Sequence, residues 1–190
     1  MDLLRPNDES PLSSTGAGVP AEVQPLDDSL SVKMRTLLAR AMSQSTLNSR
    51  TELYHHILDQ MVADEARIIG ALSDGSLSPV VNVYDRARRR GSCRAVLVHA
   101  SLIGRTANLS LPEAVPAYIG HLLALGLVEI GSEEPDLKDD YEILLAEPSV
   151  MSVIENVSRG PIPARVERLA ISLSSLGDAL WATTMPAAVL

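Results

Sequence analysis

The chain has 190 residues, 46% of them apolar, and a net charge of −8. This size fits one domain with a tail, and a core with no Phe and only 3% aromatic residues favours packed helices over a β-sandwich. The acidic charge argues against bulk binding of nucleic acid, because phosphate contacts need clustered Lys and Arg. With one Cys, no signal-peptide pattern and no apolar run of membrane-spanning length, we expect a cytoplasmic protein with no internal disulfide and no membrane contact.

The N-terminal part is predicted to be a tail followed by helices. Residues 1–29 are rich in Ser, Pro, Gly and Asp without periodicity, which is typical of a disordered tail. Residues 30–76 form a predicted N-terminal helical segment. Apolar stripes at helical spacing predict three helices there: 32–42, 49–61 and 64–72. Asp64 and Glu65 open the third helix, where acidic side chains oppose the positive end of the helix dipole.

Residues 77–185 are predicted to form a winged-helix-like domain that packs with the helical segment as one unit. Its first elements are predicted to be a β-branched strand, a basic loop and a helix, over 79–84, 85–94 and 95–107. Ser110 is a good N-cap for the following helix, and Glu113 three residues later completes a capping box.

The order of elements after Ser110 is that of a winged helix. An amphipathic helix over 111–125 ends at Gly126 and is followed by a strand over 127–130. The remaining elements are an acidic excursion, a helix, a strand and a last helix, over 131–140, 147–157, 169–173 and from 176 onward. We therefore predict a mainly α (α+β) fold: N-terminal helices plus a winged-helix-like core, with a short β-sheet and a helix inserted in the wing.

The helix that would read DNA in such a fold lacks the chemistry to do so. Residues 112–125 contain no Lys or Arg, and only His121 could carry a positive charge. A reading helix normally offers Arg, Lys, Asn or Gln to base edges. The usual DNA face of this fold is therefore predicted to serve another purpose.

The sequence predicts no catalytic residues, no metal site and no cofactor. His55 and His56 are adjacent in a predicted helix, so their side chains point about 100° apart and cannot share a metal cleanly. Asp64 and Glu65 lack an accompanying nucleophile or oxyanion hole, and helix capping explains them more simply. Cys93 lies among arginines, but no matching His motif accompanies it.

One basic cluster is the candidate site for a partner or for phosphate. Six of the sixteen Lys and Arg residues fall in this short stretch: Arg86, Arg88, Arg89, Arg90, Arg94 and Arg105. Arginine binds carboxylate and phosphate through two parallel hydrogen bonds. The alternative is a solvated loop, or a loop that pairs with the acidic excursion of the same chain.

Several motifs together resemble the abortive infection alpha (Abi-alpha) family. The helical stretch Leu53–Ile69 ends in Asp-Glu-Ala-Arg-Ile-Ile, similar to the Asp-Glu-Ala-Arg-Ile-Leu signature of that family. The stretch Tyr118–Val128 resembles the family pattern Tyr-x-x-Asn-Leu-x-Arg-Leu-Gly-Leu-Val, with His121 in place of Asn and Ala124 in place of Arg. Two later segments, Tyr141–Leu144 and Leu173–Gly177, resemble its remaining elements.

The resemblance implies a small bacterial cytosolic protein linked to phage defence, with no catalytic residue to carry over. The first hypothesis is a non-enzymatic interaction protein that binds a protein partner, or a second copy of itself. The alternative is a winged-helix DNA-binding regulator that contacts phosphate through the Arg86–Arg94 loop. An enzyme is the third and least supported hypothesis.

Overall fold

The structure is a computed structural model that describes residues 28–86, 93–158 and 162–185. The chain divides into two compact units, residues 1–46 and 47–190. The predicted disordered tail falls almost entirely outside the described residues. In the first unit, helix α1 (Asp28–Ser43) confirms the predicted helix over 32–42, and every side chain described in it is exposed.

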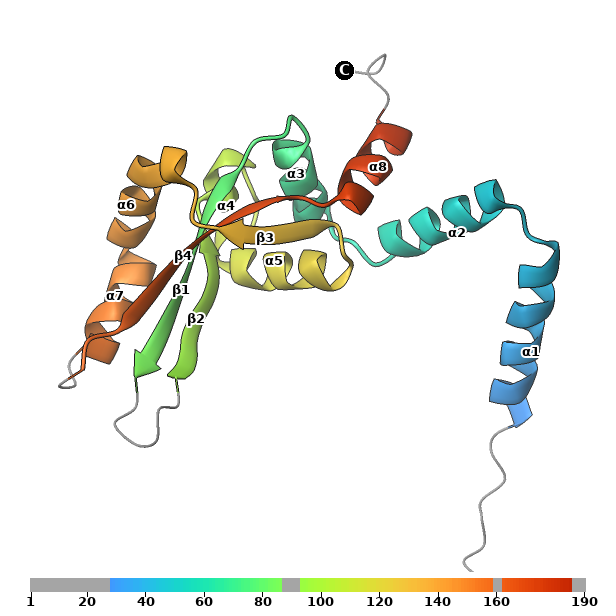
Figure 1. Ribbon diagram of the computed structural model, residues 1–190, viewed down its shortest axis with the longest axis horizontal. Coiled ribbons are helices and arrows are strands. Elements are labelled where there is room, and N and C mark those ends of the chain that lie inside the picture. Colours follow the sequence, from blue (N-terminus) through green and yellow to red (C-terminus); the bar gives the residue numbers. More distant parts are fainter. Residues whose placement is uncertain (1–27, 87–92, 159–161, 186–190) are drawn as a thin grey trace, which may run out of the picture. The chain divides into compact units, whose positions relative to one another are not determined.

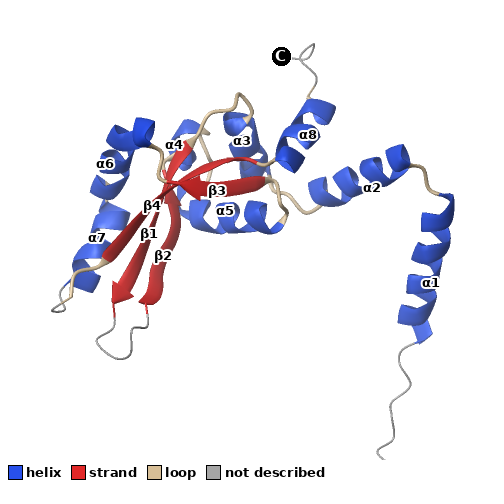
Figure 2. Ribbon diagram, viewed as in Figure 1, coloured by secondary structure: helices blue, strands red, loops and turns tan. Residues whose placement is uncertain are grey.

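The second unit combines helices with one antiparallel sheet, which confirms the predicted α+β class (Figures 1 and 2). Its strands are β1 (Ser78–Arg86), β2 (Cys93–Ser101), β3 (Val128–Ser132) and β4 (Arg165–Leu173). The helices are α2 (Thr46–Leu58), α3 (Ala63–Leu72), α4 (Ile103–Thr106), α5 (Val115–Ala124), α6 (Lys138–Ala146), α7 (Pro148–Ser158) and α8 (Ser175–Thr184). Two 3-10 turns, η1 (Pro112–Ala114) and η2 (Pro135–Leu137), precede α5 and α6.

The strands lie in the order β2-β1-β4-β3, and every neighbouring pair is antiparallel. β1 and β2 form a hairpin, whereas β3 and β4 pair across the segment that contains α6 and α7. The predicted sequence of helix, Gly, strand, insertion and strand is therefore present, although the insertion holds two helices rather than one. The name winged helix for this arrangement stays a prediction.

The predicted helix over 95–107 is wrong, because most of that segment is strand β2. Val96 and Val98 are β-branched, and the segment satisfies its backbone hydrogen bonds by pairing with β1. Only the short helix α4 follows, at Ile103–Thr106. Because β2 is an edge strand whose first four side chains are all exposed, no regular alternation of buried side chains marks it, and the local pattern imitates a helix.

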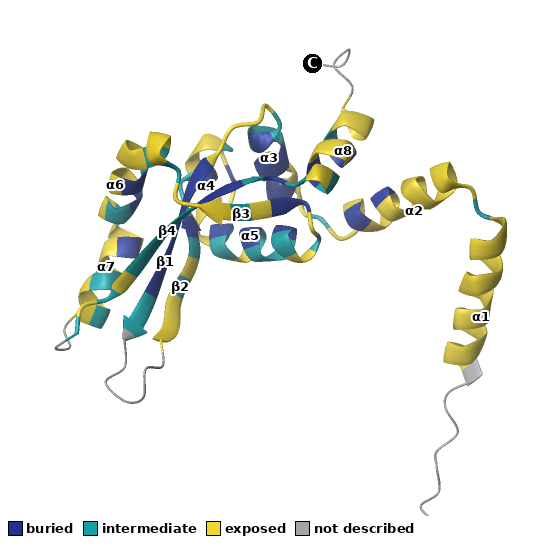
Figure 3. Cartoon of the chain, viewed as in Figure 1, coloured by how far each residue is buried: buried dark blue, intermediate teal, exposed yellow. Residues whose placement is uncertain are grey.

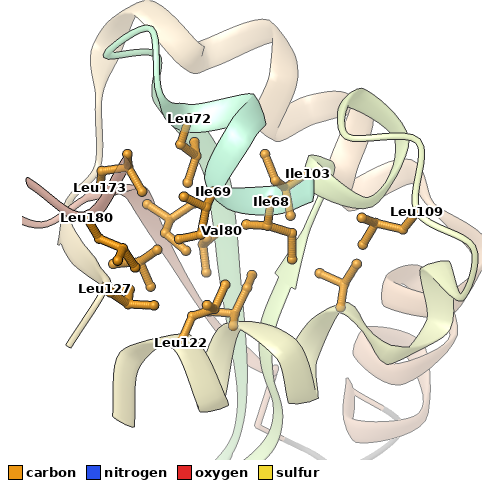
Figure 4. Close-up of a cluster of buried hydrophobic side chains, with 14 of the residues drawn as sticks. Ile68, Ile69, Leu72, Val80, Ile103, Leu109, Leu122, Leu127, Leu173 and Leu180 are labelled. Carbon is orange, nitrogen blue, oxygen red and sulfur yellow. The ribbon is translucent and has the colours of Figure 1, made fainter. Parts of the chain in front are cut away.

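Both faces of the sheet are covered by helices in the half near α3. On one face α3, α5 and α8 bury a core that includes Ile68, Leu72 and Val80 (Figure 4). On the other face α6 and α7 pack over Val81 and Val83. Successive residues of β1 thus enter different cores, as the two-residue period of a strand requires.

Candidate functional site

The structure divides the predicted arginine cluster between opposite ends of β2. Arg86 is the last residue of β1 and pairs in register with Cys93, and Arg94 follows in β2. Arg105 lies beyond the other end of β2, in the last turn of α4. Arg88, Arg89 and Arg90 lie outside the described residues. The six arginines therefore do not form one patch. Of those that the structure describes, Arg86 and Arg94 lie at the same end of the sheet and remain together in one candidate site.

That candidate site is the end of the sheet at which β1 terminates and β2 begins, called here the distal end. It comprises residues 82–86 of β1, 93–98 of β2 and 165–167 of β4, which are brought together by strand pairing. The first four residues of β2 are all exposed (Figure 3). β4 adds Arg165, a residue that the sequence did not single out, in register with Tyr84.

A polar ladder crosses the distal end from β1 to β4. The Tyr84 hydroxyl donates a hydrogen bond to Glu167 Oε2 at 2.8 Å, and Asn82 Nδ2 donates to the same oxygen at 3.2 Å. Arg165 Nη2 lies 3.4 Å from Glu167 Oε1, and its guanidinium carbon lies 5.7 Å from the centre of the Tyr84 ring. Tyr84 is thus fixed at its hydroxyl and covered by a cation on its face.

The ladder shifts the pKa of both ionisable groups at its centre. Hydrogen bonds from Tyr84 and Asn82, followed by the charge of Arg165, hold the pKa of the Glu167 carboxyl below its ordinary value. The hydrogen bond to Glu167, together with burial, raises the pKa of the Tyr84 phenol. At neutral pH the pair is therefore an ionised carboxylate and a neutral phenol, which is the arrangement that keeps the hydrogen bond.

Loss of the Glu167 charge is expected to remove the stabilisation that the ladder provides. Since the pKa of Glu167 is depressed on folding, its contribution is present above the ordinary carboxyl range near pH 4 and is lost as pH falls through the folded value. Urea unfolding of the wild type and Glu167→Gln should show the wild type more stable at pH 7. The difference between their free energies of unfolding should narrow toward pH 3. A difference that is constant with pH would contradict this assignment.

The edge strand β2 is irregular beside the ladder. Its register against β1 shifts twice, between the partners of Val81 and Val83 and between those of Val83 and Tyr84. At the first shift His99 has φ 58°, and its backbone N–H donates to the side-chain oxygen of Asn82 at 2.8 Å. Bulges of this kind discourage another strand from pairing with an edge. The distal end is therefore suited to contacts through side chains rather than through strand addition.

The acidic residues Asp64 and Glu65 have structural roles, as predicted, but the two side chains bind different backbone groups. Glu65 Oε2 accepts the backbone N–H of Val62 at 2.9 Å, which caps α3. Asp64 accepts the backbone N–H groups of Ser110 and Leu111, both at 3.0 Å. These bonds, strongest among them that from Ser110, hold the pKa of Asp64 below its ordinary value.

The predicted capping box at Ser110 is wrong, because Asp64 replaces it from another helix. Leu111 occupies the cap position of η1, and no side chain caps that turn. The Ser110 hydroxyl instead accepts a hydrogen bond from Arg67 Nη1 at 2.9 Å. The chain before α5 is thus held to α3 through a long-range contact that no local pattern reveals.

Two further findings concern metal binding and membrane insertion. Across 28–86, 93–158 and 162–185, no three His, Cys, Asp or Glu side chains are grouped so as to hold a metal ion. Within the same ranges, no helix is both long enough and apolar enough to span a bilayer.

The fold and the distal end define a small α+β protein in which exposed arginine side chains lie beside a half-buried tyrosine at one end of a sheet. The chain belongs to the abortive infection alpha family, whose sequence profile matches residues 12–184. Family membership links it to abortive infection and confirms the resemblance inferred from the motifs. No curated protein matches the chain.

A solved structure shares the fold. It is that of an uncharacterized protein from the hydrocarbon-degrading marine bacterium Alcanivorax borkumensis SK2, with 29% sequence identity and a TM-score of 0.57. The similarity covers 73% of this chain and 96% of the other, so nearly the whole of that protein has a counterpart here.

Proposed function

We propose that the protein acts in abortive infection as a non-enzymatic interaction protein that binds an acidic protein partner through the distal end of its sheet. The observation that supports this most is the Tyr84–Arg165 pair, which is held in place by Glu167 and lies at the exposed end of the sheet. Tyrosine and arginine are the residue types that most often contribute binding energy at protein interfaces.

The surroundings of this pair support a protein partner with negative charge. Val96 and Val98 are 46% and 39% exposed on β2, so apolar area is available beside the charged groups. Arg94 is exposed on the same strand, in register with Asp85, and Arg86 ends the adjoining strand. With Arg165 and Glu167 these residues sum to one net positive charge. Apolar contacts bordered by arginine suit an acidic protein surface better than a nucleic-acid backbone, which needs charge along an extended track.

Reversing the charge of the distal end is expected to weaken partner binding at least tenfold without unfolding the protein. The test uses Arg94→Glu/Arg165→Glu, with Arg50→Glu on the exposed face of α2 as the control for a general change of charge. A partner captured from phage-infected cells by the wild type and the control, and bound at least tenfold more weakly by the double variant, would support the proposal. Thermal unfolding of all three proteins monitors the fold.

The same variants separate this function from the alternative of a DNA-binding regulator that contacts phosphate through the Arg86–Arg94 loop. A regulator would bind duplex DNA with an affinity that falls steeply with salt, and the double variant would flatten that slope. Salt-sensitive DNA binding of this kind, or a partner held equally well by the double variant, would overturn the proposal.

A further inference from the structure

A second candidate site lies beside Arg105, the last arginine of the predicted cluster, near the end of β2 that leads into α4. A cavity of about 470 Å³ opens between the end of β2, the start of α5 and the junction of α6 with α7. Its walls are mainly apolar and include Leu97, Leu102, Val115 and Leu144. This volume lies within the range of small-molecule sites, and a few polar groups on apolar walls are typical of them.

The charged groups of the cavity are two carboxylates and one guanidinium. Arg105 and Glu147 form an ion pair at 2.7 Å, and Glu113 lines the same cavity. The three groups sum to one net negative charge. A ligand that brings a positive charge is therefore favoured over one that brings a negative charge.

The two members of the ion pair differ in how easily each side chain can leave the pair when a ligand enters. The Glu147 side chain is 20% exposed, and its residue is fixed by backbone hydrogen bonds from Val150 and Met151 to its carbonyl oxygen. The Arg105 side chain is 67% exposed, on the last turn of a four-residue helix. Arg105 can turn into solvent at little cost, since an exposed ion pair is a weak interaction, whereas the Glu147 side chain has less room to move.

We propose that this cavity binds an elongated cation, a primary ammonium or guanidinium group on an aliphatic chain, which Glu147 accepts in place of Arg105. The aliphatic part lies against Leu97, Leu102 and Leu144, as the stems of lysine and arginine lie on apolar surfaces. The cation then occupies the position that the protein's own guanidinium fills in the free protein. Arg105 thus acts as an internal competitor for the site.

Calorimetric titration with butylguanidinium tests whether the cavity binds a cation carried on an aliphatic chain. Butylguanidinium is expected to bind the wild type, and Glu147→Gln should weaken that binding at least tenfold because the charge of the acceptor is lost. Arg105→Ala should instead tighten binding about two- to fivefold, the amount by which an exposed ion pair competes with the ligand. Arg165→Ala, which changes an arginine at the distal end, is the matched control and should leave binding unchanged.

Two further probes identify the source of the cation. Tighter binding of agmatine than of N-acetyl-argininamide indicates a free guanidino-amine, and the reverse order indicates an arginine side chain of a partner protein. Weaker binding by Arg105→Ala, equal binding by Glu147→Gln, or preferential binding of hexanoate would each overturn the proposal. Because Arg105 is mostly exposed, Arg105→Ala is expected to fold. Its affinity for butylguanidinium therefore tests the proposal even if Glu147→Gln does not fold.

Discussion

Replacing Gly177 with alanine is expected to destabilise the second unit by about 3 kcal/mol, near the upper end of the usual cost of overpacking. A β-carbon at this position would collide with the backbone carbonyl of Leu127, and it would also meet Leu173 Cδ2 at 3.3 Å. The carbonyl cannot move aside, because it accepts the backbone N–H of Ser174 at 3.0 Å. The first turn of α8 must then separate from the segment that precedes β3.

Urea unfolding at pH 7 measures this effect, and Gly120→Ala is the matched control. Gly120 lies inside α5, where an added β-carbon meets only His99 Nδ1, at the ordinary contact distance of 3.8 Å. Alanine is the better helix former, so the control should be neutral or stabilise the protein by about 0.5–1 kcal/mol. Equal effects at Gly120 and Gly177 would show that the close approach to Leu127 is not the reason for glycine at 177.

The same contact explains why two glycine-containing segments of the family pattern belong together. Gly126 has φ 73°, a left-handed conformation that ends α5 and turns the chain into β3. The Ser174 hydroxyl bonds to the carbonyl oxygen of Gly126, and the backbone N–H of Gly177 donates to that hydroxyl at 3.0 Å. The end of α5 and the start of α8 are therefore one structural unit, although they are about 50 residues apart in sequence.

The sequence predicted best those elements whose side chains face a core on one side. The stripe of α3 and the alternation of β4 arise from burial, and both elements occur where their patterns lie. β2 was missed because its outer edge meets solvent and its register shifts twice against β1. Without a regular period, a run of apolar residues such as Ala95–Ala100 does not distinguish a strand from a helix.

The candidate sites could be predicted only where the chemistry is local. The arginines before and after 87–92 stand out in an acidic chain, but Tyr84 and Glu167 are 83 residues apart and carry no motif. Their contact depends on the register between β1 and β4, which is set by the core rather than by the two residues themselves. For the same reason, the separation of Arg105 from Arg94 depends on β2 being extended, which the sequence did not reveal.

Replacing Glu65 with alanine is expected to destabilise the protein by about 2–3 kcal/mol. The Glu65 side chain is 2% exposed and joins two elements, since Oε2 accepts the Val62 N–H and Oε1 lies 2.7 Å from His121 Nδ1 on α5. Alanine removes both contacts and leaves a void and an uncapped backbone donor at the start of α3. Urea unfolding should show this loss, whereas Glu155→Ala on the exposed face of α7 should change stability by less than about 0.5 kcal/mol.

A double-mutant cycle with His121→Ala then isolates the link between α3 and α5. Alanine has no group that can hydrogen-bond to Glu65, so it removes the contact without making a new one. We expect His121→Ala alone to cost about 1 kcal/mol, and to cost nothing further once Glu65 is alanine. Purely additive effects of the two substitutions would mean that Glu65 stabilises the fold through the Val62 cap alone, and that the contact with α5 contributes nothing.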